Sequence, residues 1–100
     1  MPKFDEDAAI EVAYESEEVV KFEEANPECV FDVGKMSPKE TEAWIKKHPK
    51  ADVGSPPPKN LWVVELVELG KEKIVVTISP ETKKIVEIKK EEAEKFPEEE

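Results

Sequence analysis

Few side chains in this 100-residue chain carry the chemistry of a catalytic group. There is one histidine, His48, and one cysteine, Cys29. Histidine is the usual general acid or base near neutral pH, and a cysteine becomes a nucleophile when a neighbouring base lowers its pKa. His48, however, lies just before Pro49 at the end of a predicted helix, where cationic side chains are ordinary. Cys29 lies in the apolar alternation of a predicted strand, which favours a small buried side chain. We therefore predict no catalytic residue and no enzyme.

The acidic side chains also lack a recognisable site motif. Two groups lie near the start of the chain, Asp5 to Asp7 with Glu11, and Glu15 with Glu17 and Glu18. Calcium takes six to eight oxygen ligands from a tightly turned loop, and no loop of that type is present. A single cysteine excludes a cysteine-rich zinc site, and three scattered glycines do not make a phosphate-binding loop. We predict no metal and no cofactor.

The net charge of −10 restricts the class of partner. All 15 Lys and Arg residues are lysines, and apart from a minor cluster at Lys46, Lys47 and Lys50 the chain lacks a basic face that would neutralise phosphates. We predict no nucleic acid partner, while a basic protein surface would be attracted. No apolar run reaches the length of a membrane span, so no membrane insertion is expected. The start of the chain has no apolar signal core, so the protein is expected to be cytoplasmic as written, or exported if a signal segment has been removed. The abundance of Lys and Glu suggests a heat-loving source as a hypothesis.

Local signals predict the first half of the chain. Residues 5–25 are predicted to form one helix, because Asp5 is a suitable N-cap and the apolar residues that follow it share one face. The alternative is a break near Ser16, which would cap a second helix through Ala25. Residues 28–36 alternate as a strand, with Cys29, Phe31 and Val33 on one face. Ser37-Pro38-Lys39-Glu40 is a capping box and starts a short helix over 38–48.

The second half is predicted to be mostly β. Strands are expected over 61–69, 73–79 and 84–89, and their short connections make an antiparallel meander. A proline-containing loop precedes them, one helical turn is expected over 91–96, and the tail 97–100 is expected to be disordered. The prediction is one α+β domain over 1–100. In it the N-terminal helix packs on an antiparallel sheet of about four strands, with a short inserted helix.

Alternation assigns the strand residues to two faces. Trp62, Val64 and Leu66 share the inner face with Ile74, Val76 and Ile78, while the last strand turns inward either Val86 and Ile88 or Ile85. The remaining apolar residues would form a patch on the outer face, which marks an interface or a covered face. Aromatic residues outside the core also anchor partners. The candidate partner-binding residues are Trp44, Val63, Val67, Val75 and Ile85.

The strand from Leu61, the returning strand from Ile74 and the turn Ser79-Pro80-Glu81-Thr82-Lys83 resemble PepSY-like domains. The N-terminal runs Ala8–Ala13 and Val19–Phe22, followed by Asn26-Pro27, are similar to the opening helices of that family. By matching of the apolar and turn pattern, the resemblance covers about 60 of the 100 residues. Ser79 stands where the family usually has Asp, and Lys84 where it has Gly. The resemblance implies a cystatin-like fold and non-catalytic binding, with inhibition of a peptidase as one form.

Two functions are therefore expected from the sequence. The first is a protein- or peptide-binding domain that uses the sheet face or the loop 49–60. The alternative is a structural domain that forms a homodimer through its outer sheet face.

Overall fold

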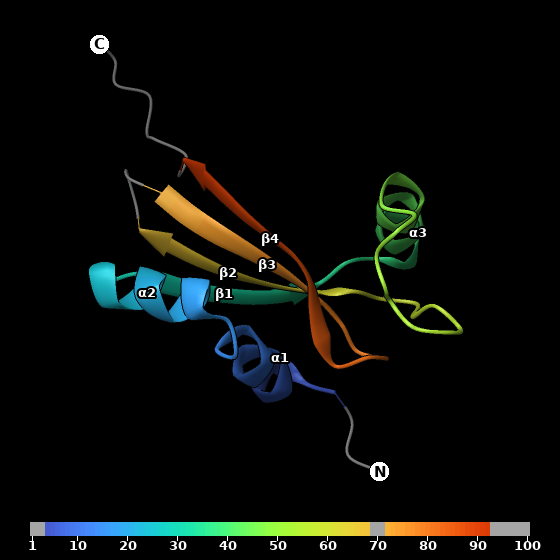
Figure 1. Cartoon of the computed structure of the whole chain (residues 1–100), viewed down its shortest axis with the longest axis horizontal. Helices are drawn as coiled ribbons and strands as arrows, with labels where there is room; N and C mark the ends of the chain where they lie inside the picture. Colours follow the sequence, from blue (N-terminus) through green and yellow to red (C-terminus); the bar gives the residue numbers. More distant parts are fainter. Residues whose placement is uncertain (1–3, 69–71, 93–100) are drawn as a thin grey trace.

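The computed structural model of the chain describes residues 4–68 and 72–92, in which two N-terminal helices precede a four-stranded antiparallel sheet (Figure 1). In chain order a third helix follows the first strand and precedes the second. In space it lies at one end of the sheet (Figure 1). The predicted α+β class and the packing of N-terminal helices on the sheet are confirmed.

Two short helices take the place of the single helix predicted over 5–25. Helix α1 spans Glu6–Ala13 and α2 spans Glu17–Ala25. Each begins at a capping side chain: the Asp5 carboxylate and the Ser16 hydroxyl accept hydrogen bonds from backbone N–H groups of the turns that follow them. The alternative start at Ser16 is thus correct, because a hydroxyl that caps a new helix takes the place of continued helical hydrogen bonding.

The sheet has the strand order β1-β2-β3-β4, and every neighbouring pair is antiparallel. Its strands begin and end within a few residues of the predicted bounds, apart from the end of the last one. The helical turn predicted from Glu91 is wrong, because Glu91 continues β4 opposite Lys73. The rest of that turn, the tail 97–100 and the connection 69–71 lie outside the described residues. The strands are β1 Val30–Lys35, β2 Trp62–Glu68, β3 Glu72–Ser79 and β4 Lys84–Glu92.

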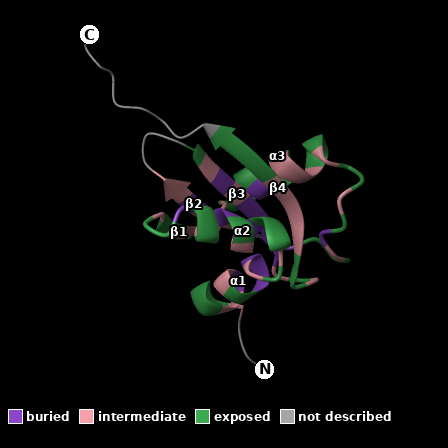
Figure 2. Ribbon diagram, turned by 60° about the vertical axis from the view of Figure 1, so that its left-hand side comes forward, coloured by how far each residue is buried: buried purple, intermediate pink, exposed green. Residues whose placement is uncertain are grey.

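The hydrophobic core lies between α1, α2 and one face of the sheet, which we call the inner face (Figure 2). Full burial of a valine, leucine or isoleucine side chain contributes about 1.5–3 kcal/mol to folding stability. The burial of these side chains therefore determines which face of each strand points toward the helices. The inner-face alternation predicted for β2 and β3 is confirmed. The buried core residues are Ala9, Val12, Ala13, Val19, Phe22, Trp62, Val64, Leu66, Ile74, Val76 and Ile78.

A β-bulge in the last strand pair decides which face Ile85 occupies. Ile85 lies opposite Ile78 and Ile88 lies opposite Val76, so the register shifts by one residue and Val86 has no opposite residue. An extra residue in one strand lets both flanking side chains point the same way. Ile85 and Ile88 therefore both pack against the core. The placement of Ile85 on the outer face is wrong.

The loop before β2 is held against the turn between β3 and β4. The Ser79 hydroxyl donates a 2.6 Å hydrogen bond to the carbonyl of Val53, and both residues are buried. Pro58 is buried as well, while Pro56 and Pro57 are exposed. The loop 49–60 is therefore partly built into the fold.

Candidate functional site

Helix α3 spans Pro38–Lys47 and lies at one end of the sheet (Figure 1). The capping box predicted at its start is present: the Ser37 and Glu40 side chains each accept a hydrogen bond from the other residue's backbone N–H, at 3.1 and 2.9 Å. Thr41, only 2% exposed, accepts a 3.0 Å hydrogen bond from the N–H of Leu61. These local and long-range hydrogen bonds fix the start of α3 beside the start of β2.

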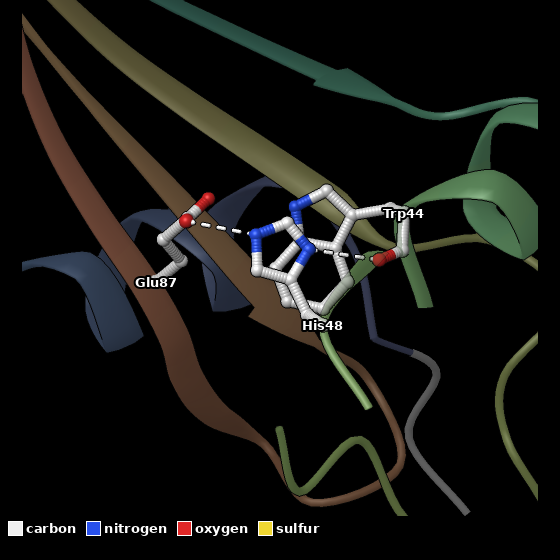
Figure 3. Close-up of polar contacts among 3 residues, drawn as sticks. All are labelled: Trp44, His48 and Glu87. Carbon is white, nitrogen blue, oxygen red and sulfur yellow. Dashed lines mark hydrogen bonds and ion pairs between the residues drawn. The ribbon is translucent and has the colours of Figure 1, made fainter. Parts of the chain in front are cut away.

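The end of α3 is fixed to the opposite edge of the sheet through His48 (Figure 3). The His48 ring stacks on the Trp44 indole, with centroids 3.9 Å apart and 14° between the planes. Its Nδ1 lies 2.8 Å from the Trp44 carbonyl oxygen, and its Nε2 lies 3.1 Å from Oε2 of Glu87 on β4. A carbonyl and a carboxylate only accept, so the imidazolium form satisfies both contacts by donating from both nitrogens. His48 therefore has a structural role as a link between α3 and β4.

An open groove of about 460 Å³ lies between α3 and the outer face of β1 and β2. Its apolar part contains Trp44 and Val63. A Cβ placed on Gly34 would have no heavy atom within 4 Å, so this position leaves the groove wide. Charged side chains of both signs stand around the apolar part. The groove is lined by Asp32, Gly34, Lys35, Met36, Glu40, Ala43, Trp44, Lys47, Val63 and Glu65.

The structure separates the five candidate residues predicted from the sequence. Trp44 and Val63 meet in the groove. Val67 and Val75 are half-buried on the outer face and do not line it, and Ile85 lies on the inner face. Sequence reasoning assigned His48 to a helix end but missed its contact with Glu87, because no local pattern relates residues 39 positions apart.

A second polar cluster surrounds the lone cysteine near the start of β1. The Tyr14 hydroxyl donates a 3.0 Å hydrogen bond to Glu23. Burial, followed by this hydrogen bond, raises the pKa of Tyr14 to about 12. Burial also raises the pKa of the Cys29 thiol, and the charges of Glu23 and Glu68 add to that shift. A thiol held in its protonated form is a poor nucleophile, so the cluster lacks the activation that cysteine catalysis needs.

Within residues 4–68 and 72–92, no three His, Cys, Asp or Glu side chains are placed to hold a metal ion together. None of the helices in the same residues has the length and apolar character required to cross a bilayer.

Comparisons of the chain with protein-family models, with curated proteins and with solved structures find no match.

Proposed function

We propose that this protein is a non-catalytic protein- or peptide-binding domain whose site is the groove between α3 and the outer face of β1 and β2. The observation that carries the proposal is the open volume of about 460 Å³ beside Trp44. Binding sites are concave and combine an apolar lining with a few placed polar groups. This groove has both.

The side chains of the groove suit an extended polypeptide segment. Trp44 and Val63 offer apolar contact to one or two side chains of a ligand, as aromatic anchors do in protein interfaces. Asp32 and Glu65 lie opposite each other on neighbouring strands and would attract a basic residue. The chain's charge of −10 favours the approach of a basic partner in the same way.

The positions of the other reactive groups favour binding over catalysis. Both ring nitrogens of His48 are engaged, by Trp44 and by Glu87. The raised pKa of Cys29 opposes thiolate formation. The resemblance to PepSY-like domains implies non-catalytic binding as well, and regulation of a peptidase is the form of it that we propose. Helix α3, which forms one wall of the groove, belongs to the part of the chain outside that resemblance.

Peptide selection tests this proposal. Wild-type protein is used to select from a displayed library of random peptides, and selected peptides are titrated against two variants. Gly34→Leu extends a side chain from a groove position where a Cβ meets no heavy atom within 4 Å, while Lys89→Leu adds the same side chain to an exposed position of the outer face beyond the groove. We expect Gly34→Leu to weaken binding about tenfold or more, or about 1.4 kcal/mol, and Lys89→Leu to leave it unchanged. No enriched peptide, or equal binding by Gly34→Leu, would contradict the proposal.

A second candidate function is self-association through the outer face. One observation favours it: Val30, which is 55% exposed, lies opposite Val67 on that face. A Val67→Lys substitution would then abolish the homodimer. If Val67→Lys associates as the wild type does, this face is not the interface.

A further inference from the structure

The open edge of the sheet at β1 has unpaired hydrogen-bonding groups. The N–H of Met36 donates to the carbonyl of Leu61, at 2.8 Å, which shows that Met36 directs its backbone groups toward β2. Along an antiparallel strand, the backbone N–H and C=O groups of successive residues point alternately to the two sides of the strand. Phe31, Val33 and Lys35 therefore direct their N–H and C=O groups away from the sheet. Among the described residues, no hydrogen bond joins these groups to another segment.

The two edges of the sheet differ in how they are protected. Strand β4 is rich in charged residues, and charges on an edge discourage further pairing. Strand β1 carries only one Asp and one Lys, which cancel, and it has no proline. The large hydrophobic residues that are exposed in the described part of the chain, Val30 and Phe31 at 55% and 40%, both belong to β1. An unprotected edge of this kind is a template for strand addition.

We propose that β1 pairs with β1 of a second copy of this chain, antiparallel and centred on Val33, so that two sheets join into one. The centre must be a residue whose backbone groups point outward, which leaves Phe31, Val33 or Lys35. Centring on Lys35 places like charges opposite each other, which destabilises a strand pair. Centring on Phe31 leaves Gly34 and Lys35 paired only with residues before the strand begins.

The register centred on Val33 is self-complementary along the whole strand. Phe31 lies opposite Lys35 of the second copy, so the lysine stem covers an exposed ring. Val33 lies opposite itself. On the outer face Val30 lies opposite Met36, and Asp32 lies opposite Gly34, so no pair brings like charges together. The helices of both copies stay on the same side of the joined sheet, because the two-fold axis is perpendicular to it.

Pairing of β1 with a second copy does not require that the groove bind a ligand. The groove and the proposed β1 interface share one position, Gly34. It lines the groove, and Asp32 of the second copy would lie beside Gly34. Peptide titration of a monomeric variant therefore tests the groove separately from the dimer. Since each copy carries −10, salt should strengthen the dimer by screening their repulsion.

Disulfide cross-linking tests the register directly. In a Cys29→Ser background, Val33→Cys places two cysteines opposite each other with Cα atoms about 5.5 Å apart, within disulfide range. The matched control Lys35→Cys places its two cysteines four residues out of register, roughly 13 Å apart along the strand. We expect a covalent dimer from Val33→Cys alone. Equal cross-linking of both variants would overturn the register.

A charge exchange tests the same contact without engineered cysteines. Phe31→Lys places the new lysine opposite Lys35 of the second copy and should weaken dimerisation at least tenfold, measured by light scattering across a dilution series. Adding Lys35→Glu turns each of these pairs into a lysine opposite a glutamate and should restore the dimer, which also shows that the substituted chain is folded. A wild-type chain that stays monomeric at all concentrations, or a Phe31→Lys chain that dimerises normally, would overturn the proposal.

Discussion

The imidazole of His48 and the carboxylate of Glu87 lie 3.1 Å apart, although 39 residues separate them in the chain. This contact joins the end of α3 to the far edge strand of the sheet. Thr77, which lies opposite Glu87 on the neighbouring strand, is only 3% exposed. The outer face is therefore buried at Thr77, while Val63, Val67 and Val75 on the same face are half-buried.

We predict that Glu87→Ala lowers the free energy of unfolding by about 0.5–1.5 kcal/mol, the range for a partly exposed charged hydrogen bond. Urea unfolding measures this change. Glu91→Ala is the matched control on the same strand, since the Lys73–Glu91 pair is longer, at 3.7 Å, and more exposed. Its effect should be close to zero. Equal losses in the two variants would show that the His48 contact contributes nothing specific.

Two glycines should respond in opposite ways to substitution by alanine. Gly54 has φ of +106°, and a Cβ there would lie 2.7 Å from Cβ of Glu81. Gly54→Ala should therefore lower the free energy of unfolding by about 1–3 kcal/mol. Gly34 meets no atom within 4 Å, so Gly34→Ala should raise it by up to about 1 kcal/mol. Thermal and urea unfolding of the pair test both statements, and a stable Gly54→Ala variant would contradict the first.

Titration of the sole tyrosine tests the cluster around Cys29. The absorbance change of Tyr14 should have its midpoint at about 12, and Glu23→Gln should lower that pKa because it removes a negative charge. The folded-state pKa is raised, so the folded chain holds the proton longer than the unfolded chain. The stability that Tyr14 contributes is thus full below about pH 10 and is lost as the pH rises toward 12.

The comparison of wild type with Tyr14→Phe isolates this contribution from the titration of lysines in the same range. Above about pH 10, the unfolding free energy of the wild type should fall relative to that of Tyr14→Phe. An absorbance midpoint at the ordinary value, with a difference that does not change with pH, would contradict the structure of the cluster.

The bulge in β4 predicts unequal effects at two neighbouring residues. Ile85 packs against the core, while Val86 has no opposite residue in the sheet. Ile85→Ala should therefore lower the free energy of unfolding by about 1–3 kcal/mol, and Val86→Ala by less than about 1 kcal/mol. Denaturant unfolding of both variants decides between this register and a regular one. A larger loss for Val86→Ala would indicate that the strand is shifted.

Local signals made much of this fold predictable. The caps at Asp5, Ser16 and Ser37 act within a few residues, so the sequence alone reveals them. The alternation of β2 and β3 was also sufficient, because the apolar residues of one face are fully buried while Val63, Val67 and Val75 on the other are only half-buried. The face of Ile85 was not predictable in this way, since it depends on a bulge formed against another strand.

The candidate site was only partly predictable for a related reason. Trp44 and Val63 were identified as apolar residues outside the core, but the groove between them exists because α3 is held at both ends by distant residues. Thr41 binds the backbone of Leu61, and His48 binds Glu87. Contacts of that kind follow from the folded arrangement and leave no periodic pattern in the sequence.

Chemical-shift mapping of a selected peptide tests the groove most directly. The backbone amides of Gly34 and Val63 and the indole N–H of Trp44 report on it, while those of Val75 and Lys89 report on the outer face beyond it. We predict that titration with the peptide shifts the first set and leaves the second unchanged, in both the wild type and the Phe31→Lys variant. Shifts confined to the second set, or to the inner face, would contradict the assignment of the groove as the binding site.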